Sequence, residues 1–258
     1  MKTISNTPSK TTVAVATLAL FLALTAQAAT FTLNPSADAF VTTGPTANFS
    51  GNNYGGAGAL SVTAPGLASG EFQSVLRFDL SGAKTSFNSQ FGAGQWSIQS
   101  ITLSLTATAP NNAIFNSSAT GQFGISWMQN DSWTEGAGTP AAPTTTGITF
   151  STLPSFTGAG DEALGTFSFV GGTSGTAAYN LSLTSGFDAD ATAGNLVSFR
   201  LFAADSAVSY LFDSRSFGTT GFRPLLTIVA VPEPGALSLL ATGVAMLLGA
   251  KCRRRLHG

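Results

Sequence analysis

The chain has 258 residues, only 9% of them Asp, Glu, Lys or Arg, and its formal net charge is −1. An average soluble protein contains roughly 25% of these residues. Nucleic-acid binding is not expected, because there is no excess of cations to neutralise phosphates. A single Cys cannot form a disulfide within the chain, and a hydrophobic content of 43% argues against disorder.

The N-terminus has the three parts of a secretory signal peptide. Lys2 and Lys10 supply positive charge, and an uncharged, mostly apolar run occupies 13–25. Ala26-Gln27-Ala28 then supplies the small-x-small cleavage pattern. We therefore expect residues 1–28 to form a signal helix that the general secretory machinery uses, with the mature chain beginning at Ala29. A buried core helix is the alternative.

The middle of the chain reads as strands and turns. Apolar and polar residues alternate in short runs, which predicts strands at 72–80, 101–106, 197–202, 208–213 and 225–231. No segment of 29–230 has a sustained helical period, so helices are not expected there. The pattern predicts an all-β fold, one antiparallel β-sandwich over 29–230. Gly-, Pro-, Asn- and Ser-rich segments separate the strands, at 43–58, 64–71, 81–97, 109–121, 134–147 and 157–165.

An ordered series of short motifs runs through the same region. It includes ADAFV at 37–41, SVLRFDLS at 74–81, DSWTEG at 131–136, FDSR at 212–215 and RPLL at 223–226. In this order the motifs are similar to the DNRLRE-type secreted β-sandwich domains, over roughly 31–230. The chain departs from that family at 147–150, where a Trp usually follows a Thr. The resemblance implies a jelly-roll-like sandwich of the kind that is often non-catalytic and sometimes binds polysaccharide.

Residues 29–230 contain few side chains that could act in catalysis or bind a metal. His257 and Cys252, the one His and the one Cys of the chain, lie outside this region, which holds five cations and 11 acids and has a net charge near −6. Nucleophile–His catalysis and metal sites built from His and Cys are therefore excluded there. Paired carboxylates could still cleave glycosidic bonds. The closest pairs in sequence are Asp161 with Glu162, Asp188 with Asp190, and Asp131 with Glu135. We expect solvated loop acids instead, and predict no catalytic residue.

Trp133 is the candidate for glycan contact. It stands between Asp131 and Glu135 in a loop-like stretch, where an aromatic plane beside two acceptors could orient a sugar. Core packing is the alternative for Trp133. Trp127 alternates with Phe123 and is predicted to be a core residue.

No cofactor is expected, although Ca²⁺ held by loop oxygens is conceivable. Its ligands would be Asp38, Asn53 and Asp213, for which turn and capping roles are the alternative. Arg77 with Asp79, and Asp213 with Arg215, lie two residues apart and are predicted to form surface or cross-strand ion pairs.

The C-terminus combines three features. Pro232-Glu233-Pro234 precedes an uncharged stretch over 235–250, and a basic end follows at Lys251, Arg253, Arg254 and Arg255. A helix over 235–250 would be about 24 Å long, short for the ~30 Å core of a bilayer, but flanking cations could snorkel. The basic end is expected to stay cytoplasmic.

This tail, over 231–258, resembles the PEP-CTERM sorting signal of Gram-negative bacteria. The resemblance implies recognition by an exosortase, transient residence in the inner membrane through a single transmembrane helix, and removal of the tail. It also implies delivery to the cell surface or extracellular matrix, in association with exopolysaccharide or biofilm. A plain single-span anchor is the alternative.

The sequence thus predicts a non-enzymatic exported protein of the cell surface or matrix. A carbohydrate-binding module for a specific polysaccharide is the second hypothesis, and a polysaccharide hydrolase or lyase is the third.

Overall fold

Residues 27–107, 115, 120–169 and 174–233 are described by the computed structural model of the chain. They fall into two compact units. The larger one comprises Thr30–Ser86 and Ile98–Val229, and the smaller one includes the described residues 27–29, 87–97 and 230–233.

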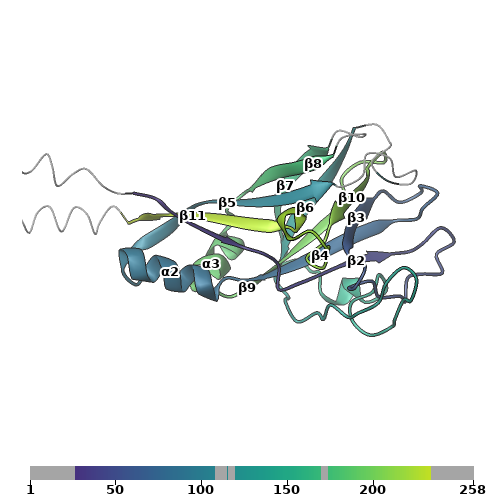
Figure 1. Ribbon diagram of the computed structural model, residues 1–258, viewed down its shortest axis with the longest axis horizontal. Helices are drawn as coiled ribbons and strands as arrows, with labels where there is room; N and C mark the ends of the chain where they lie inside the picture. Colours follow the sequence, from purple (N-terminus) through teal and green to yellow (C-terminus); the bar gives the residue numbers. More distant parts are fainter. Residues whose placement is uncertain (1–26, 108–114, 116–119, 170–173, 234–258) are drawn as a thin grey trace, which may run out of the picture. The chain divides into compact units, whose positions relative to one another are not determined.

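Strands dominate the described elements (Figure 1). The predicted strands over 72–80, 101–106, 197–202, 208–213 and 225–231 are all present, within one to five residues of their expected ends. In chain order the elements are β1 (Ala29–Leu33), β2 (Ala37–Thr42), β3 (Ala59–Thr63), β4 (Phe72–Asp79), α2 (Ser81–Phe91), β5 (Trp96–Ala107), β6 (Gly121–Met128), a 3₁₀ turn (Leu153–Ser155), β7 (Glu162–Phe169), β8 (Gly175–Leu181), α3 (Ser185–Ala193), β9 (Leu196–Ala203), β10 (Ser209–Asp213), a second 3₁₀ turn (Thr220–Phe222) and β11 (Leu225–Pro232).

The strands form two antiparallel sheets. A four-stranded sheet has the order β1-β11-β5-β8. A seven-stranded sheet has the order β10-β3-β4-β9-β6-β7, and β2 also pairs with β4. The prediction of an all-β antiparallel fold is confirmed, and two such sheets are consistent with a β-sandwich.

Aromatic rings join the two sheets within the larger unit. Tyr179 of β8 meets Phe123 of β6 and Phe167 of β7, each with ring centroids 5.2 Å apart. Phe123 also contacts Tyr210 and Phe212 of β10. Trp127 lies four residues after Phe123 on the same face of β6, and its side chain is 5% exposed. Its predicted core position is therefore confirmed, and the Phe content supplies the volume of the core.

The other face of the seven-stranded sheet is also covered. Alternate residues of β2 and Val75 of β4 pack there with Trp133, Ile148 and Leu153, which come from the long segment 129–161 between β6 and β7. As a result β2 is buried along all six of its residues. A strand buried on both sides shows no clean polar face in its sequence.

Two helices contradict the prediction that 29–230 lacks them. α2 buries Ala83 and Phe87, and α3 buries Phe187 and Ala191. Each helix thus buries one pair of side chains four positions apart. Two buried positions are too few to produce a visible helical period in the sequence.

The start of α3 is fixed by a strand residue. The Glu162 carboxylate of β7 accepts hydrogen bonds from the N–H groups of Gly186 and Phe187, each at 2.9 Å. The Thr184 and Ser185 hydroxyls donate to it as well. These bonds, the Thr184 hydroxyl first, lower the pKa of Glu162 to about 2. A negative charge at the positive end of a helix is the expected stabilising arrangement.

The smaller unit contains the start of β1 and the end of β11. Ala28 is exposed, β1 begins at Ala29, and β11 ends at Pro232. The N–H of Glu233 donates to the carbonyl of Gln95 at 2.9 Å. Ala26, Pro234, the predicted signal helix and the predicted span with its basic end lie outside the described residues. None of the helices in the described part of the chain is long and apolar enough to cross a membrane.

Candidate functional site

Trp133, the candidate for glycan contact, is a buried residue. The side chain is 1% exposed, in the cluster that covers the outer face of the seven-stranded sheet. Its Nε1–H donates to Ser198 Oγ at 2.9 Å, which satisfies the only polar atom of the ring. A sugar cannot stack on a buried plane, so Trp133 is a core residue.

Arg77 holds the same stretch of chain in place. Its Nη1 donates to the carbonyls of Asp131 and Trp133, both at 2.8 Å, and its guanidinium lies 4.9 Å from the centre of the Trp133 ring. The Asp79 carboxylate instead accepts from the N–H of Ser81 at 3.0 Å. The predicted ion pair between Arg77 and Asp79 is therefore wrong. Burial raises the pKa of Asp131 to about 6.

Glu135, the third residue of the proposed glycan contact, belongs to a charged cluster with Asp38 and Arg215. Arg215 forms a bidentate ion pair with Glu135, through Nη2 to Oε2 and through Nε to Oε1 at 2.6 Å. Glu135 Oε1 also accepts from the N–H of Asp38 at 3.0 Å, and Asp38 Oδ2 accepts from the N–H of Arg215 at 2.7 Å. The cluster joins β2, the segment after β6 and the segment after β10. Arg215 thus pairs with Glu135, where the sequence predicted Asp213.

Asp38 is the least exposed member of this cluster. It is 0% exposed, and its Oδ1 has no hydrogen-bond partner. Burial raises the pKa of the Asp38 carboxyl to about 7, and the charge of Glu135 raises it further, while the hydrogen bond from the Arg215 N–H opposes both. Glu135 binds the guanidinium of Arg215, whereas Asp38 binds only its backbone N–H. The cluster therefore links three chain segments and contains one carboxyl group that is readily protonated.

Asn53 organises the loop that follows Glu135. Its Nδ2 donates to the carbonyls of Glu135 and Ile148, at 2.6 and 2.8 Å. Its Oδ1 accepts from the N–H groups of Gly55 and Gly138, each at 3.2 Å. Asn53 therefore acts as a turn-forming residue, and its oxygen is not available for Ca²⁺.

Close packing around Asn53 explains one of the glycines in this loop. A Cβ on Gly138 would lie 1.9 Å from the Asn53 carbonyl oxygen, so any other residue would force the loop away.

The remaining predicted acids are dispersed. Asp161 accepts from the N–H of Gln129, Glu162 caps α3, and Asp190 accepts from Asn195 Nδ2 at 2.7 Å. Asp213 is buried on β10. Within the described ranges, no three His, Cys, Asp or Glu side chains gather where they could hold a metal ion.

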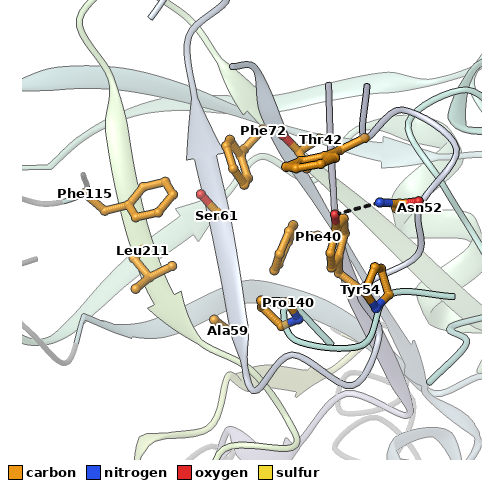
Figure 2. A pocket seen from close by; sticks show the side chains of 12 residues that line it. Phe40, Thr42, Asn52, Tyr54, Ala59, Ser61, Phe72, Phe115, Pro140 and Leu211 are labelled. Atoms are coloured by element: carbon orange, nitrogen blue, oxygen red, sulfur yellow. Dashed lines mark hydrogen bonds between the residues drawn. The ribbon is translucent and has the colours of Figure 1, made fainter. Parts of the chain in front are cut away.

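A pocket of about 410 Å³ lies in the larger unit (Figure 2). Phe40 and Thr42 point into it from β2, on the same face of that strand as Asp38. The other residues that line it are Phe49, Asn52, Tyr54, Ala59, Ser61, Phe72, Phe115, Pro140, Pro143 and Leu211. The volume lies within the range of roughly 300–1,000 Å³ that is typical of small-molecule sites.

Stacked rings form one wall of the pocket. Phe40 and Tyr54 lie nearly parallel, at 12° with centroids 4.7 Å apart, and Phe72 is 5.5 Å from Phe40. Backbone pairing between Phe40 and Tyr54 fixes this stack. Sequence reasoning missed the pocket because its aromatic residues come from separate strands and loops with no shared motif. Abundant Phe was the only available signal, and it equally indicates a core.

Comparison with known proteins finds no protein-family model that matches the chain and no curated protein that matches it.

Proposed function

We propose that this chain is a non-enzymatic binding protein, exported to the cell surface or extracellular matrix, with a jelly-roll-like sandwich as its folded region. The observation that supports it most directly is the composition of the pocket. The described residues that line it include no acid, base or cation, and no His or Cys. A concave apolar site of this kind can hold a ligand, but it offers no group for proton transfer.

The acids of the charged cluster are engaged in structure. Glu135 is paired with Arg215, and Asp38 is fully buried and bonded to the Arg215 backbone. A glycosidase needs one carboxylic acid and one carboxylate on either side of an accessible sugar. Neither Asp38 nor Glu135 faces such a space, which favours binding over hydrolysis.

The alternative, a carbohydrate-binding module, is not supported at the residue that was predicted to contact the glycan. Trp133 is buried, so a glycan would have to bind elsewhere, and the pocket is almost entirely apolar. Sugar hydroxyls placed there would lose water without gaining equivalent hydrogen bonds. We therefore place any association with exopolysaccharide outside this pocket.

Export and sorting complete the proposal. The signal peptide over 1–28 and the PEP-CTERM-like tail over 231–258 support secretion, recognition by an exosortase and release from the inner membrane. β1 begins at Ala29, directly after the expected signal cleavage, and β11 ends at Pro232, the first residue of the Pro232-Glu233-Pro234 motif.

Two measurements test the proposal. The purified full chain is incubated with the extracellular polysaccharide of the producing cells, and reducing ends and unsaturated sugars are assayed. We expect none above the background, and release of either product would refute the non-enzymatic role.

The mass of the protein recovered from the cell surface tests sorting. We expect it to lack residues 1–28 and the basic end, and a variant with Pro232, Glu233 and Pro234 replaced by Ala should keep its tail. A surface form of the unaltered chain that still contains Cys252 would rule out tail removal.

A further inference from the structure

We infer that the pocket between β2, β3, β4 and β10 binds an uncharged small molecule with a single aromatic ring system. The inference rests on the proposed binding role and names the class of ligand. It follows from the shape and chemistry of the lining in three steps.

The first step is the absence of charge among the described lining residues. A charged ligand group would be desolvated in the pocket with no opposite charge to meet it, at a large cost in free energy. Arg215 and Glu135 are not among the lining residues, and they already neutralise each other in a bidentate pair. The part of the ligand that enters must therefore be neutral.

The second step concerns the few polar atoms of the lining. Thr42 Oγ1 accepts from the N–H of Gly44 at 2.9 Å, and Ser61 Oγ donates to the carbonyl of Tyr210 at 3.2 Å. Asn52 Nδ2 donates to the Tyr54 hydroxyl at 3.2 Å, the dashed contact in Figure 2. Because each polar side chain already has a protein partner, the pocket is poorly suited to a ligand rich in hydroxyls.

The third step is the arrangement of the rings. Phe40, Tyr54 and Phe72 present faces and edges that are held in fixed orientations by their contacts with one another. Aromatic pairs in offset or edge-to-face geometry gain about 0.5–1.5 kcal/mol beyond area burial, which an aliphatic ligand of equal size does not gain. Two prolines, Pro140 and Pro143, add flat apolar surface.

One ring of the lining is exposed to solvent. Phe49 is 37% exposed, one of three large apolar side chains that the described part of the chain leaves open to solvent. Because Phe49 lines the pocket, we expect a bound ligand to contact it. Phe222 is similarly exposed, at 43%, but is not part of the pocket, and so provides a matched control.

Calorimetric titration of the full chain with indole, cyclohexanol and methyl glucoside tests the inference. We expect indole to bind most tightly, by roughly 2- to 12-fold over cyclohexanol, and methyl glucoside not to bind. Phe49→Ala should weaken indole binding by a similar factor, whereas Phe222→Ala should leave it unchanged. Ala59→Phe, which fills the pocket from β3, should weaken it about tenfold or more.

Preferred binding of cyclohexanol or methyl glucoside would overturn the aromatic class but leave a binding role standing. Equal loss of affinity in Phe49→Ala and Phe222→Ala would overturn the location. If no probe binds, the inference fails, and the assay for polysaccharide cleavage then decides separately whether the protein is an enzyme. Phe49→Ala keeps the test valid if Ala59→Phe does not fold, because it truncates an exposed side chain.

Discussion

Replacing Asp38 by Asn should stabilise the protein at neutral and alkaline pH. Asp38 is 0% exposed; its backbone N–H donates to the Glu135 carboxylate, and its own carboxylate accepts from the Arg215 N–H. Asn is nearly the same size, and its amide oxygen can accept the hydrogen bond from the Arg215 N–H. The substitution removes the buried negative charge.

The size of the effect follows from the raised pKa of Asp38. Its shift from 3.8 to about 7 corresponds to roughly 4 kcal/mol at 1.36 kcal/mol per unit, as an upper limit. Between about pH 4 and pH 7 the folded state retains a proton that the unfolded state has lost. The free energy of unfolding therefore falls as the pH rises through this window and is lowest, as far as Asp38 contributes, above pH 7. The variant should lose this part of the pH dependence.

Urea unfolding at pH 5 and pH 8 measures the difference. Asp38→Asn should gain several kcal/mol over the unaltered chain at pH 8, and clearly less at pH 5. Asp79→Asn is the matched control: Asp79 is exposed, and hydrogen bonds from Ser81 lower its pKa, so its replacement should slightly destabilise the fold at both pH values. A gain for Asp38→Asn that is equal at pH 5 and pH 8, or a loss at pH 8, would refute the reasoning.

Three further outcomes are expected. Trp133→Ala should cost about 3–5 kcal/mol of unfolding free energy in denaturant titrations, as for other buried Trp truncations; a loss under 1 kcal/mol would place the side chain at the surface. Asn53→Ala should cost roughly 3 kcal/mol or more because four backbone groups lose their partner, while the control Asn52→Ala should cost far less. In NMR titrations the Glu162 carboxyl should ionise near pH 2, and Glu162→Gln should speed amide exchange at Gly186; a normal midpoint would contradict the capping role.

The strands and the fold class follow from the sequence by itself. The alternation of apolar and polar residues in 72–80, 101–106 and 197–202 indicates strands with one buried face. This pattern is local, so it does not depend on which strands become neighbours. The same alternation placed Trp127 in the core. Absence of His and Cys from 29–230 likewise limits the chemistry of that region without reference to any fold.

The contacts and the burial of the loop residues were determined only by the tertiary structure. Trp133, Asp131 and Glu135 lie in a polar, Gly-rich stretch that resembles a solvent-exposed loop, yet this segment packs across a sheet face that also needs covering. Whether a loop is exposed to solvent or packs on a sheet depends on the course of its backbone in the folded protein. A local sequence pattern does not determine that course.

The charged cluster and the pocket also depend on contacts between residues that are distant in the sequence. Asp38 meets Glu135 across 97 positions, and Glu135 meets Arg215 across 80. The pocket joins β2 to Leu211 of β10. Helix α3 begins where it does because Glu162 of strand β7 accepts hydrogen bonds from its first N–H groups. Each arrangement arises from strand pairing between distant segments, and this is why the sequence supplied the residues and the tertiary structure determined their roles.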